Sequence, residues 1–350
     1  MKKVILLSCI IFFPINSFGQ EKTQPNIILM IGDGMGLTQI TAGMYSNGNK
    51  TALEDFTFIG LSKTHSHNSL VTDSAASGTA MASGVKTMNG VIGINIKNQK
   101  VKSILEISKE KGYQTGLIAT SSIVHATPAS FYANVLSRKE YQKIAFQMSE
   151  SDLDYFIGGG QKHFTKRNDK RNLLQEMEDF DIVSSLSRFN KSQAPKVGLF
   201  TNRDEPTRIS DGIRIPLKDA VSSVLNQLDK DRKPFFMMVE GSQIDWGGHA
   251  NDMSYVISEF NDFNDAIQTV LDFTKDHPNT LVIVTADHET GGFSIPKGKI
   301  KNFRVEGAFS TIGHTATMVP VFTKGPSAEI FSGIYDNTSI FKKMLKVVNQ

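Results

Sequence analysis

Cysteine is nearly absent from this sequence, with Cys9 as its only example in 350 residues. Cys9 lies in an N-terminal segment that begins with two lysines, continues with an apolar run over residues 4–13 and ends in the small residues of "SFG". That layout is typical of a secretory signal peptide, and the apolar run is too short to span a bilayer. We expect cleavage after residue 19 and a periplasmic or secreted protein. The mature chain then has no disulfide and no thiol ligand, so its stability must come from a large core.

The sequence also lacks a large excess of charge of either sign, since it contains 38 lysines and arginines and 35 acidic residues. Loss of the two N-terminal lysines lowers the formal net charge from +3 to +1. A nearly neutral surface gives no indication of nucleic acid or of an anionic membrane as a partner. Repeats and low-complexity linkers are missing as well. We therefore expect a single domain over residues 20–350, with a peripheral insertion near residues 161–211.

Short apolar runs that do not alternate with polar residues predict strands covered on both faces. These runs occupy residues 26–31, 115–119, 235–239, 281–285 and 318–322. Apolar residues with helical spacing lie between them, at residues 101–111, 217–228 and 255–273. Strands that alternate with helices predict an α/β fold, here a three-layer sandwich around a mostly parallel central β-sheet.

Acidic residues and a histidine follow three of these predicted strands. Asp33 follows the first, Glu240 ends the third, and Asp287 and His288 follow the fourth. In open α/β sheets, ligands bind beyond the carboxyl ends of the strands, so these side chains stand where a site is expected. The segment "IGDGMG" lacks the last glycine of a dinucleotide-binding loop, because Leu37 occupies that position. Asp33 is then either a metal ligand or part of a tight turn, and Asp287 either a ligand or a helix cap.

Two further segments place a histidine near an acid or a strand. In "VEGSQIDWGGHA", Asp245 and His249 are four residues apart and share one face of a helical turn. They suit zinc or another borderline divalent ion, or else form an ordinary surface pair. His314 precedes the last predicted strand, where it is either structural or a further ligand. Together, the carboxylates and histidines of these segments are enough for two or three divalent cations.

The stretch "VTDSAASGTAMASG" places Ser74 at the start of a small-residue helix, directly after Asp73. Ser74 does not lie in a G-x-S-x-G elbow, since Thr72 and Ala76 occupy the glycine positions, and no S-x-x-K follows it. Metal coordination is therefore the remaining way to activate its hydroxyl as a nucleophile. In "HATPASFYANVLSR", Arg138 is either a surface residue or a fork for two phosphate oxygens.

These segments together resemble the alkaline phosphatases, a family of zinc- and magnesium-dependent phosphomonoesterases. The matching motifs lie in family order between residues 26 and 322 and read "NIILMIGDGMG", "VTDSAASGTAMASGVKTMNGVIG", "HATPASFYANVLSR", "VEGSQIDWGGHA", "TADHETGG" and "GHTATMVPVF". The serine segment and the three metal segments are highly specific in combination. The resemblance implies an alkaline-phosphatase-like fold, hydrolysis of a broad range of phosphate monoesters through a phosphoserine, and an alkaline pH optimum.

The resemblance also implies roles for particular residues of these motifs. Ser74 is the nucleophile, and Arg138 grips the phosphate with Asp73 as its support. The cofactors implied are two zinc ions and one magnesium ion. Their ligands would be Asp245, His249 and His314 for the first zinc ion; Asp33, Ser74, Asp287 and His288 for the second; and Asp33, Thr127 and Glu240 for magnesium.

Two positions depart from the family pattern beside the magnesium and the phosphate. His125 stands where some members carry aspartate, and Trp246 where some carry lysine or histidine. His125 is therefore a further candidate ligand, and we expect the third site to accept zinc or cobalt as readily as magnesium. Only 25 residues separate His288 from His314, which leaves little room for the crown insertion whose contacts often support dimers. Both a monomer and a homodimer stay open.

Other functions fit part of the sequence. A phosphodiesterase of the same superfamily would share the ligands and differ in the shape of the pocket. A non-catalytic protein could keep the site to bind phosphate or metal, although the presence of all expected ligands favours an enzyme. A sulfatase lacks support, because Ala76 replaces the proline of the C/S-x-P-x-R motif that would begin at Ser74.

Overall fold

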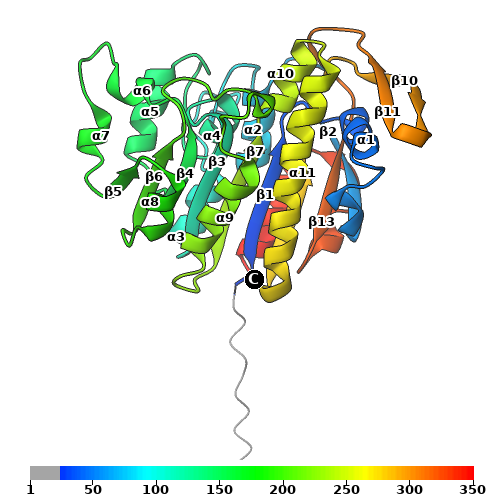
Figure 1. Cartoon of the computed structure of the whole chain (residues 1–350). Helices are drawn as coiled ribbons and strands as arrows, with labels where there is room; N and C mark the ends of the chain where they lie inside the picture. Colours follow the sequence, from blue (N-terminus) through cyan, green and yellow to red (C-terminus); the bar gives the residue numbers. More distant parts are fainter. Residues whose placement is uncertain (1–23) are drawn as a thin grey trace, which may run out of the picture.

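The computed structural model describes residues 24–350, so the predicted signal peptide at residues 1–19 lies outside the described part of the chain. One sheet of ten strands has the order β14-β2-β13-β8-β1-β7-β3-β4-β6-β5. Its neighbouring strands run parallel except where β13 pairs with β2 and with β8. Figure 1 shows this sheet with helices packed against it. The prediction of an α/β fold with a mostly parallel central sheet is confirmed.

All the strands that the apolar runs predict are present. They are β1 (Asn26–Gly32), β3 (Gln114–Ser122), β7 (Phe235–Gly241), β8 (Thr280–Thr285) and β13 (Val319–Lys324). The sheet also contains strands that the sequence analysis missed, namely β2 (Phe58–Lys63), β4 (Tyr155–Gly159), β5 (Phe180–Val183), β6 (Lys196–Phe200) and β14 (Gly333–Asp336). Of these, β2, β5 and β14 lie at or next to an edge of the sheet and leave side chains partly exposed. Strands of that kind do not need a continuous apolar run.

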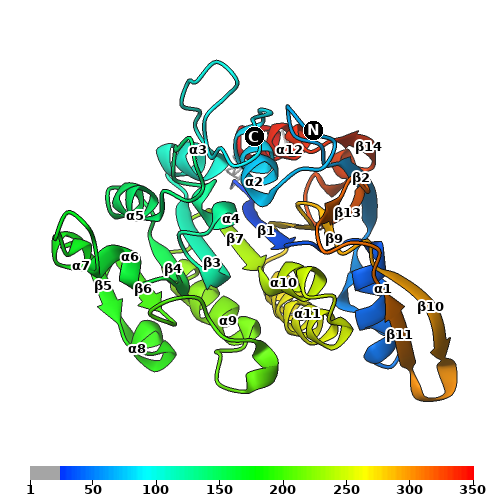
Figure 2. The ribbon, with the colours of Figure 1, turned by 90° about the horizontal axis from the view of Figure 1, so that it is seen from above.

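Helices cover both faces of the sheet, as Figure 2 shows from above. One face carries α2 (Ser74–Ser83), α3 (Ile104–Glu110), α5 (Tyr141–Ser149) and α12 (Thr338–Val348). The other carries α1 (Leu37–Ser46), α8 (Leu186–Lys191), α9 (Leu217–Leu228) and α11 (Met253–Asp276).

Strand β1 contributes side chains to the hydrophobic cores on both faces of the sheet. Ile27, Leu29 and Ile31 pack into the core on the α2 face, whereas Ile28 and Met30 pack into the core on the α11 face. Successive side chains of a strand point to opposite faces, so a strand that is apolar at every position serves both layers.

Residues 161–211, which the sequence analysis predicts as a peripheral insertion, lie along one edge of the molecule (Figure 1). They form α6 (Lys162–Thr165), α7 (Leu173–Glu176), β5, α8 and β6, and the two strands extend the sheet beyond β4. The division of residues 20–350 as one domain stays a prediction.

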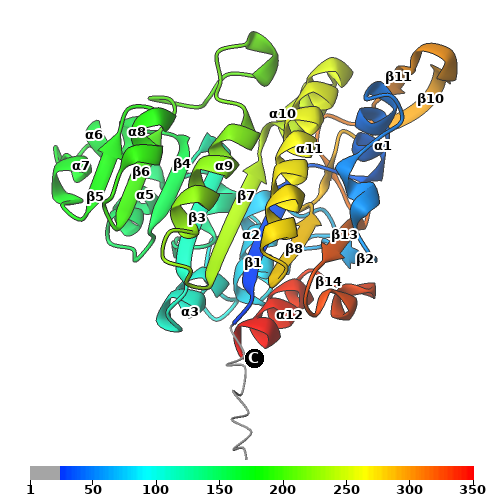
Figure 3. The same cartoon turned by 60° about the horizontal axis from the view of Figure 1, so that its bottom comes forward.

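The carboxyl ends of β1, β7 and β8 meet at the edge of the sheet where α10 (Gln243–His249) lies (Figure 1). There the short strands β9 (Glu289–Thr290) and β12 (His314–Thr315) pair with each other. Between them, β10 (Ser294–Lys299) and β11 (Arg304–Ala308) form a hairpin that projects from the body (Figure 3). No helix within residues 24–350 combines the length and the apolar character needed to cross a bilayer.

Candidate metal centre

The turn after β1 places Asp33 at the centre of the site. Its carboxylate is fully buried. Gly34 has a φ of 71°, and a Cβ at this position would stand 2.7 Å from the Asp245 Cα, so only glycine allows the turn to approach α10 this closely. The Gly34 amide donates a hydrogen bond to the Asp287 Oδ1 atom at 3.1 Å. The glycine beside Asp33 therefore joins three segments that carry predicted ligands.

The three predicted histidine ligands all have their Nδ1 atom directed at an oxygen. His249 Nδ1–H donates to the Ile312 carbonyl at 2.6 Å, and His314 Nδ1–H donates to the Thr72 carbonyl at 2.8 Å. His288 Nδ1 lies 3.3 Å from the Thr290 hydroxyl. Contacts of this kind set the tautomer and leave the Nε2 lone pair free for a metal.

The first cluster consists of Asp245, His249 and His314. His249 Nε2 lies 3.1 Å from His314 Nε2 and 3.3 Å from Asp245 Oδ2, while His314 Nε2 lies 3.5 Å from Asp245 Oδ1. Two imidazole lone pairs this close need a proton or a cation between them. The hydrogen bond to Asp245 raises the pKa of His249 to about 9 in the absence of a metal.

The second cluster surrounds His288, which is fully buried. Its Nε2 atom lies 3.1 Å from Asp287 Oδ2, 3.4 Å from the Ser74 hydroxyl and 3.6 Å from Asp33 Oδ1. Asp33, Asp245 and His288 also form a group whose ligand atoms lie within 4.8 Å of one another. The predicted nucleophile thus lies beside a convergent set of ligand atoms.

The third cluster consists of Asp33, His125 and Glu240, again with ligand atoms within 4.8 Å of one another. Glu240 Oε2 accepts hydrogen bonds from the Ser242 hydroxyl at 2.6 Å and the Ser121 hydroxyl at 3.3 Å. Burial raises the pKa of Glu240 to about 7. Burial and then the Arg138 charge lower the pKa of His125 to about 3, so this ring is neutral.

Thr127, the remaining residue predicted for the third site, lies in the short helix α4 (Ala126–Ala129), and its side chain is fully buried. His125 precedes this helix directly. The Trp246 ring stands edge-on to the His125 ring, with the ring centres 6.3 Å apart. All predicted site residues of these segments therefore lie around the same edge of the sheet.

Ser74 and Arg138 are brought together through Asp73. Ser74 is the first residue of α2, and Asp73 caps that helix by accepting a hydrogen bond from the Ala76 amide at 3.0 Å. The other Asp73 oxygen accepts from Arg138 Nη1 at 3.0 Å, and Arg138 Nη2 lies 3.3 Å from His125 Nε2. A helix N-terminus and a guanidinium fixed beside one hydroxyl form a suitable site for a phosphate group.

The buried carboxylates fit divalent cations. Neither oxygen of Asp33 has a hydrogen-bond partner in the described part of the chain, and the same holds for Glu240 Oε1. Burial raises the pKa of Asp33 well above its usual range, and the negative charges of Asp287, Asp245 and Glu240 add to that effect. Ionised carboxylates at this depth need a compensating cation. Carboxylate and imidazole together are the ligands that zinc prefers, and the third cluster is richer in oxygen.

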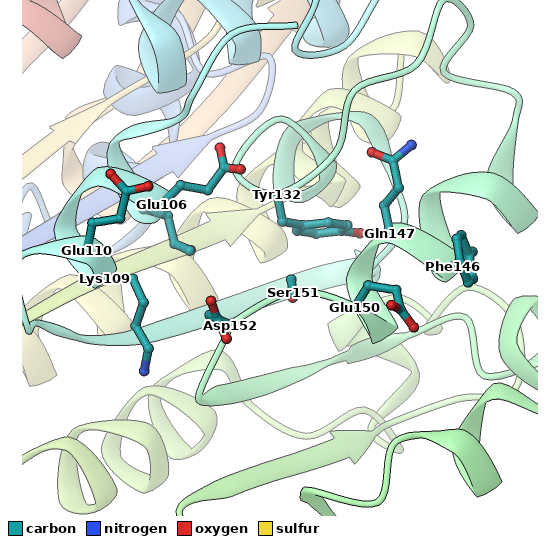
Figure 4. A pocket seen from close by; sticks show the side chains of 10 residues that line it. Glu106, Lys109, Glu110, Tyr132, Phe146, Gln147, Glu150, Ser151 and Asp152 are labelled. Carbon is teal, nitrogen blue, oxygen red and sulfur yellow. The ribbon is translucent and has the colours of Figure 1, made fainter.

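A separate cavity of about 520 Å³ opens elsewhere on the molecule, as Figure 4 shows. Its lining includes Glu106, Lys109, Tyr132, Phe146 and Asp152. None of the predicted site residues lines it.

Sequence reasoning missed the residues that hold the ligands in place. Thr290 donates a hydrogen bond to Asp245 Oδ1 at 2.5 Å, and Ser121 and Ser242 bind Glu240. The Glu289 carboxylate accepts hydrogen bonds from the Gln39 side chain and from the Gly292 and Phe293 amides. Adjacency was the one available signal, because Glu289 and Thr290 directly follow the predicted ligands Asp287 and His288.

The fold and the site together define an α/β protein with three convergent groups of metal-ligating side chains beside a serine hydroxyl. The sequence model of the alkaline phosphatases matches residues 24–306. The chain therefore belongs to the alkaline phosphatase family, and it is an enzyme that hydrolyses phosphate monoesters.

Individual relatives support this assignment over nearly the whole chain. Alkaline phosphatase 3 of Bacillus subtilis is 33% identical, over 94% of this chain and 90% of its own. Alkaline phosphatase 4 of the same organism is 37% identical, over 94% of this chain and 75% of its own. The solved structure of alkaline phosphatase from the Antarctic bacterium TAB5 is 45% identical and covers 93% of this chain and 98% of its own, with a TM-score of 0.89. Two TAB5 variants with a histidine replaced by glutamate or aspartate have Mg bound in the M3 site.

Proposed function

We propose that this chain hydrolyses a broad range of phosphate monoesters through a phosphoserine at Ser74, with an alkaline pH optimum. The observation that carries the proposal is the position of the Ser74 hydroxyl, 3.4 Å from His288 Nε2 at the start of α2. Asp245, His249 and His314 would hold one zinc ion, and Asp33, Ser74, Asp287 and His288 would hold a second. These ions supply positive charge to the reacting oxygens and lower the pKa of a hydroxyl that binds them.

The chain's own residues orient the phosphoryl group. Arg138 and the amides at the start of α2 bind its non-bridging oxygens, and Asp73 prevents the guanidinium from turning away. Ser74 Oγ attacks phosphorus while the bond to the ester oxygen breaks, and the alcohol leaves with a proton. Water then attacks the phosphoserine, returns a proton to Ser74 and releases inorganic phosphate. Each half-reaction displaces one oxygen from phosphorus, and one water is consumed in total.

At the third site we propose Asp33, Thr127, Glu240 and His125 as ligands. A neutral imidazole among the oxygen ligands suits zinc or cobalt, whereas Mg²⁺ prefers oxygen alone. The TAB5 variants support this view, because Mg is bound in the M3 site when a histidine of that enzyme is replaced by a carboxylate.

We also infer export to the periplasm or the medium. The support is the signal-peptide layout of residues 1–19 together with the lack of cysteine in the rest of the chain. Cell fractionation of the full-length chain and of a chain without residues 1–19 tests this inference. Equal cytoplasmic retention of both would contradict it.

The nucleophile is tested with Ser74→Ala. We expect kcat to fall by at least about 10³-fold, because no other hydroxyl can replace the one that forms the covalent bond. Metal content should stay near that of the unmodified protein. Ser83→Ala is the matched control, since Ser83 lies in the same helix, is buried and has no hydrogen-bond partner in the described residues. Normal turnover by Ser74→Ala would exclude Ser74 as the nucleophile.

The substrate class is tested by side-by-side hydrolysis of a phosphate monoester, a phosphate diester and a sulfate ester. The enzyme is first treated with a chelator and then resupplied with zinc and magnesium. We expect the monoester to give the highest kcat/KM, and activity to depend on the added ions. A diester that turns over faster than the monoester would favour the phosphodiesterase alternative instead.

A further inference from the structure

Glu289 is a buried carboxylate, 5% exposed, to which the proposed chemistry gives no part. It lies in β9, directly after the ligands Asp287 and His288. Its two oxygens accept hydrogen bonds from α1 and β12, which are 250 and 26 positions away in sequence, and from the backbone three and four residues further along its own segment. The donors are the Gln39 amide of α1, the backbone amides of Gly292 and Phe293 at the base of the β10–β11 hairpin, and the Thr315 hydroxyl of β12.

The four donors are shared evenly between the oxygens. Oε1 accepts from Gln39 Nε2 at 2.7 Å and from the Phe293 amide at 3.0 Å. Oε2 accepts from the Gly292 amide at 3.2 Å and from the Thr315 hydroxyl. Within the described chain, no cationic side chain forms an ion pair with Glu289. The carboxylate therefore acts purely as an acceptor for neutral donors.

Each donor segment leads to a predicted metal ligand. Thr315 follows His314, and within the β9–β12 pair it stands opposite Glu289. Gln39 belongs to the helix that follows the Asp33 turn, and its amide also donates to the Thr290 carbonyl at 2.8 Å.

The Asp33 turn itself packs onto Glu289. A Cβ at Gly36 would stand 2.5 Å from the Glu289 Cγ, so glycine is needed there for the turn to lie against this side chain. This close approach is independent of the hydrogen bonds. Both observations place Glu289 at the point where the Asp33, Asp287–His288 and His314 segments meet.

We propose that Glu289 is a positioning residue that joins these three segments and so sets the zinc affinity of the Asp245, His249 and His314 cluster. The proposal rests on the metal ligands assigned under the proposed function. A carboxylate can accept from donors on both oxygens, whereas the amide of glutamine would direct its NH₂ group at two of those donors. The strand that carries His314 would then move relative to α10, and the cluster would lose its geometry. Groups that orient metal ligands typically alter metal affinity by about 10- to 100-fold.

The test compares Glu289→Gln with the unmodified full chain by titration with Zn²⁺ against a competing chelator. We expect an apparent Zn²⁺ affinity about 10- to 100-fold lower in the variant. After replacement of zinc by Co²⁺, we expect altered d–d absorption bands, which report ligand geometry independently of activity. Unchanged affinity together with unchanged cobalt bands would overturn the proposal.

Asp154→Asn is the matched control for a merely structural effect. Asp154 is also buried, at 6% exposure, and likewise accepts from a backbone amide and a threonine hydroxyl, those of Thr115 at 2.8 and 3.0 Å. Unlike Glu289 it also pairs with a cation, Lys109, so its substitution should cost at least as much stability. It contacts no predicted ligand. We expect this variant to lower Tm while the Zn²⁺ affinity stays normal. Equal losses of Zn²⁺ affinity in both variants would mean that Glu289 only stabilises the fold in general, and this would contradict the proposal.

A milder pair of variants covers the case in which Glu289→Gln fails to fold. Thr315→Val removes one donor to Glu289 and keeps the side-chain shape, whereas Thr315→Ser keeps the hydroxyl. We expect the valine variant to bind Zn²⁺ ~3- to 10-fold more weakly and the serine variant to match the unmodified protein. Equal affinities for both would contradict the proposal. Failure of the proposed function would show itself differently, as normal turnover by Ser74→Ala whatever the zinc affinities.

Discussion

At the scale of single residues, two histidines of the metal centre, His249 and His314, are each oriented by a carbonyl outside their own motif. The Ile312 carbonyl holds His249, and the Thr72 carbonyl holds His314. A histidine can ligate through either ring nitrogen, and the hydrogen bond on one nitrogen decides that the other faces the metal. The convergence of the Nε2 atoms is therefore a property of the surrounding backbone as much as of the ligands.

Asp73 has two separable tasks, which Asp73→Asn should distinguish. One oxygen caps α2, and asparagine preserves this bond; the other binds Arg138 and the Gly90 amide, both at 3.0 Å. We expect inorganic phosphate to inhibit about 10-fold more weakly, because a charge-assisted hydrogen bond contributes roughly 1.5 kcal/mol or more. The Asp73→Asn/Arg138→Ala double variant should be no worse than Arg138→Ala alone, and additive losses would contradict the coupling.

The third site should change its metal preference with one residue. His125→Asp adds a carboxylate beside Asp33 and Glu240, and hard oxygen ligands favour Mg²⁺. We expect the Mg²⁺ concentration for half-maximal activation to fall by about 10-fold, and bound magnesium to rise when measured by elemental analysis. Trp246→Phe, which retains an aromatic ring next to His125, serves as the control. Magnesium content that is the same in all three proteins would exclude His125 from the third site.

At the scale of elements, helix α2 depends on small residues to approach α4. Gly78 faces Ser130, and a Cβ there would stand 2.7 Å from the Ser130 Oγ and 3.2 Å from its Cβ. All residues of α2 are buried, so the helix has no free direction in which to move. The alanines and glycine of this segment thus set the distance between the nucleophile and the helix that carries Thr127.

We expect Gly78→Ala to lower the free energy of unfolding by up to about 2 kcal/mol. Alanine gains about 1 kcal/mol in helix propensity, but overpacking of a buried contact costs about 1–3 kcal/mol. Denaturant unfolding measures the difference. Adding Ser130→Ala removes the hydroxyl and should restore part of the loss. Stabilisation by Gly78→Ala alone would mean that the two helices can separate without cost.

At the scale of the whole molecule, the metal centre joins the carboxyl ends of the central strands, and its charge affects the stability of the entire fold. Asp33, Glu240 and Asp287 come from segments at the ends of three neighbouring strands, and all are fully buried. Cations bound at the proposed sites would compensate this charge in the folded state and would be lost on unfolding. Metal removal should therefore act on global unfolding and not only on activity.

We expect chelation to lower Tm more at pH 8 than at pH 5.5. In the metal-free fold the pKa of Glu240 is raised by burial from 4.5 to about 7. Its stabilising contribution is therefore complete below about pH 4.5 and is lost as pH rises through about 7, at a cost of about 3 kcal/mol. The stabilising contribution of His249 is also lost as pH rises, because its pKa in the metal-free fold is raised from 6.5 to about 9. Thermal unfolding with and without chelator measures the difference.

Glu240→Gln removes one of these titrations and should make the metal-free protein less sensitive to pH. Resupply of zinc and magnesium should restore Tm of the unmodified chain at pH 8. A loss of Tm on chelation that is the same at both pH values would contradict the assigned role of these ligands in stability.

The sequence by itself determined the fold class and the main strands, and it named side chains that the fold brings together as candidate metal ligands. A continuous apolar run such as that of β1 predicts a buried strand without knowledge of its neighbours. The helical spacing of apolar residues predicted α9 over its whole length. The ligands could be named because each lies in a short local motif next to a strand end. Apolar patterning and ligand type can be recognised in a short segment, so one sequence is enough to predict them.

Only the tertiary structure decided which atoms meet. Ser74 and His288 are 214 positions apart, and the contacts of Glu289 with Gln39 and of His314 with Thr72 cross similar separations. The edge strands β2, β5 and β14 likewise depend on neighbours supplied by distant segments. Contacts of this kind have no periodicity in the sequence, because their partners lie in distant segments that only the folded chain brings together.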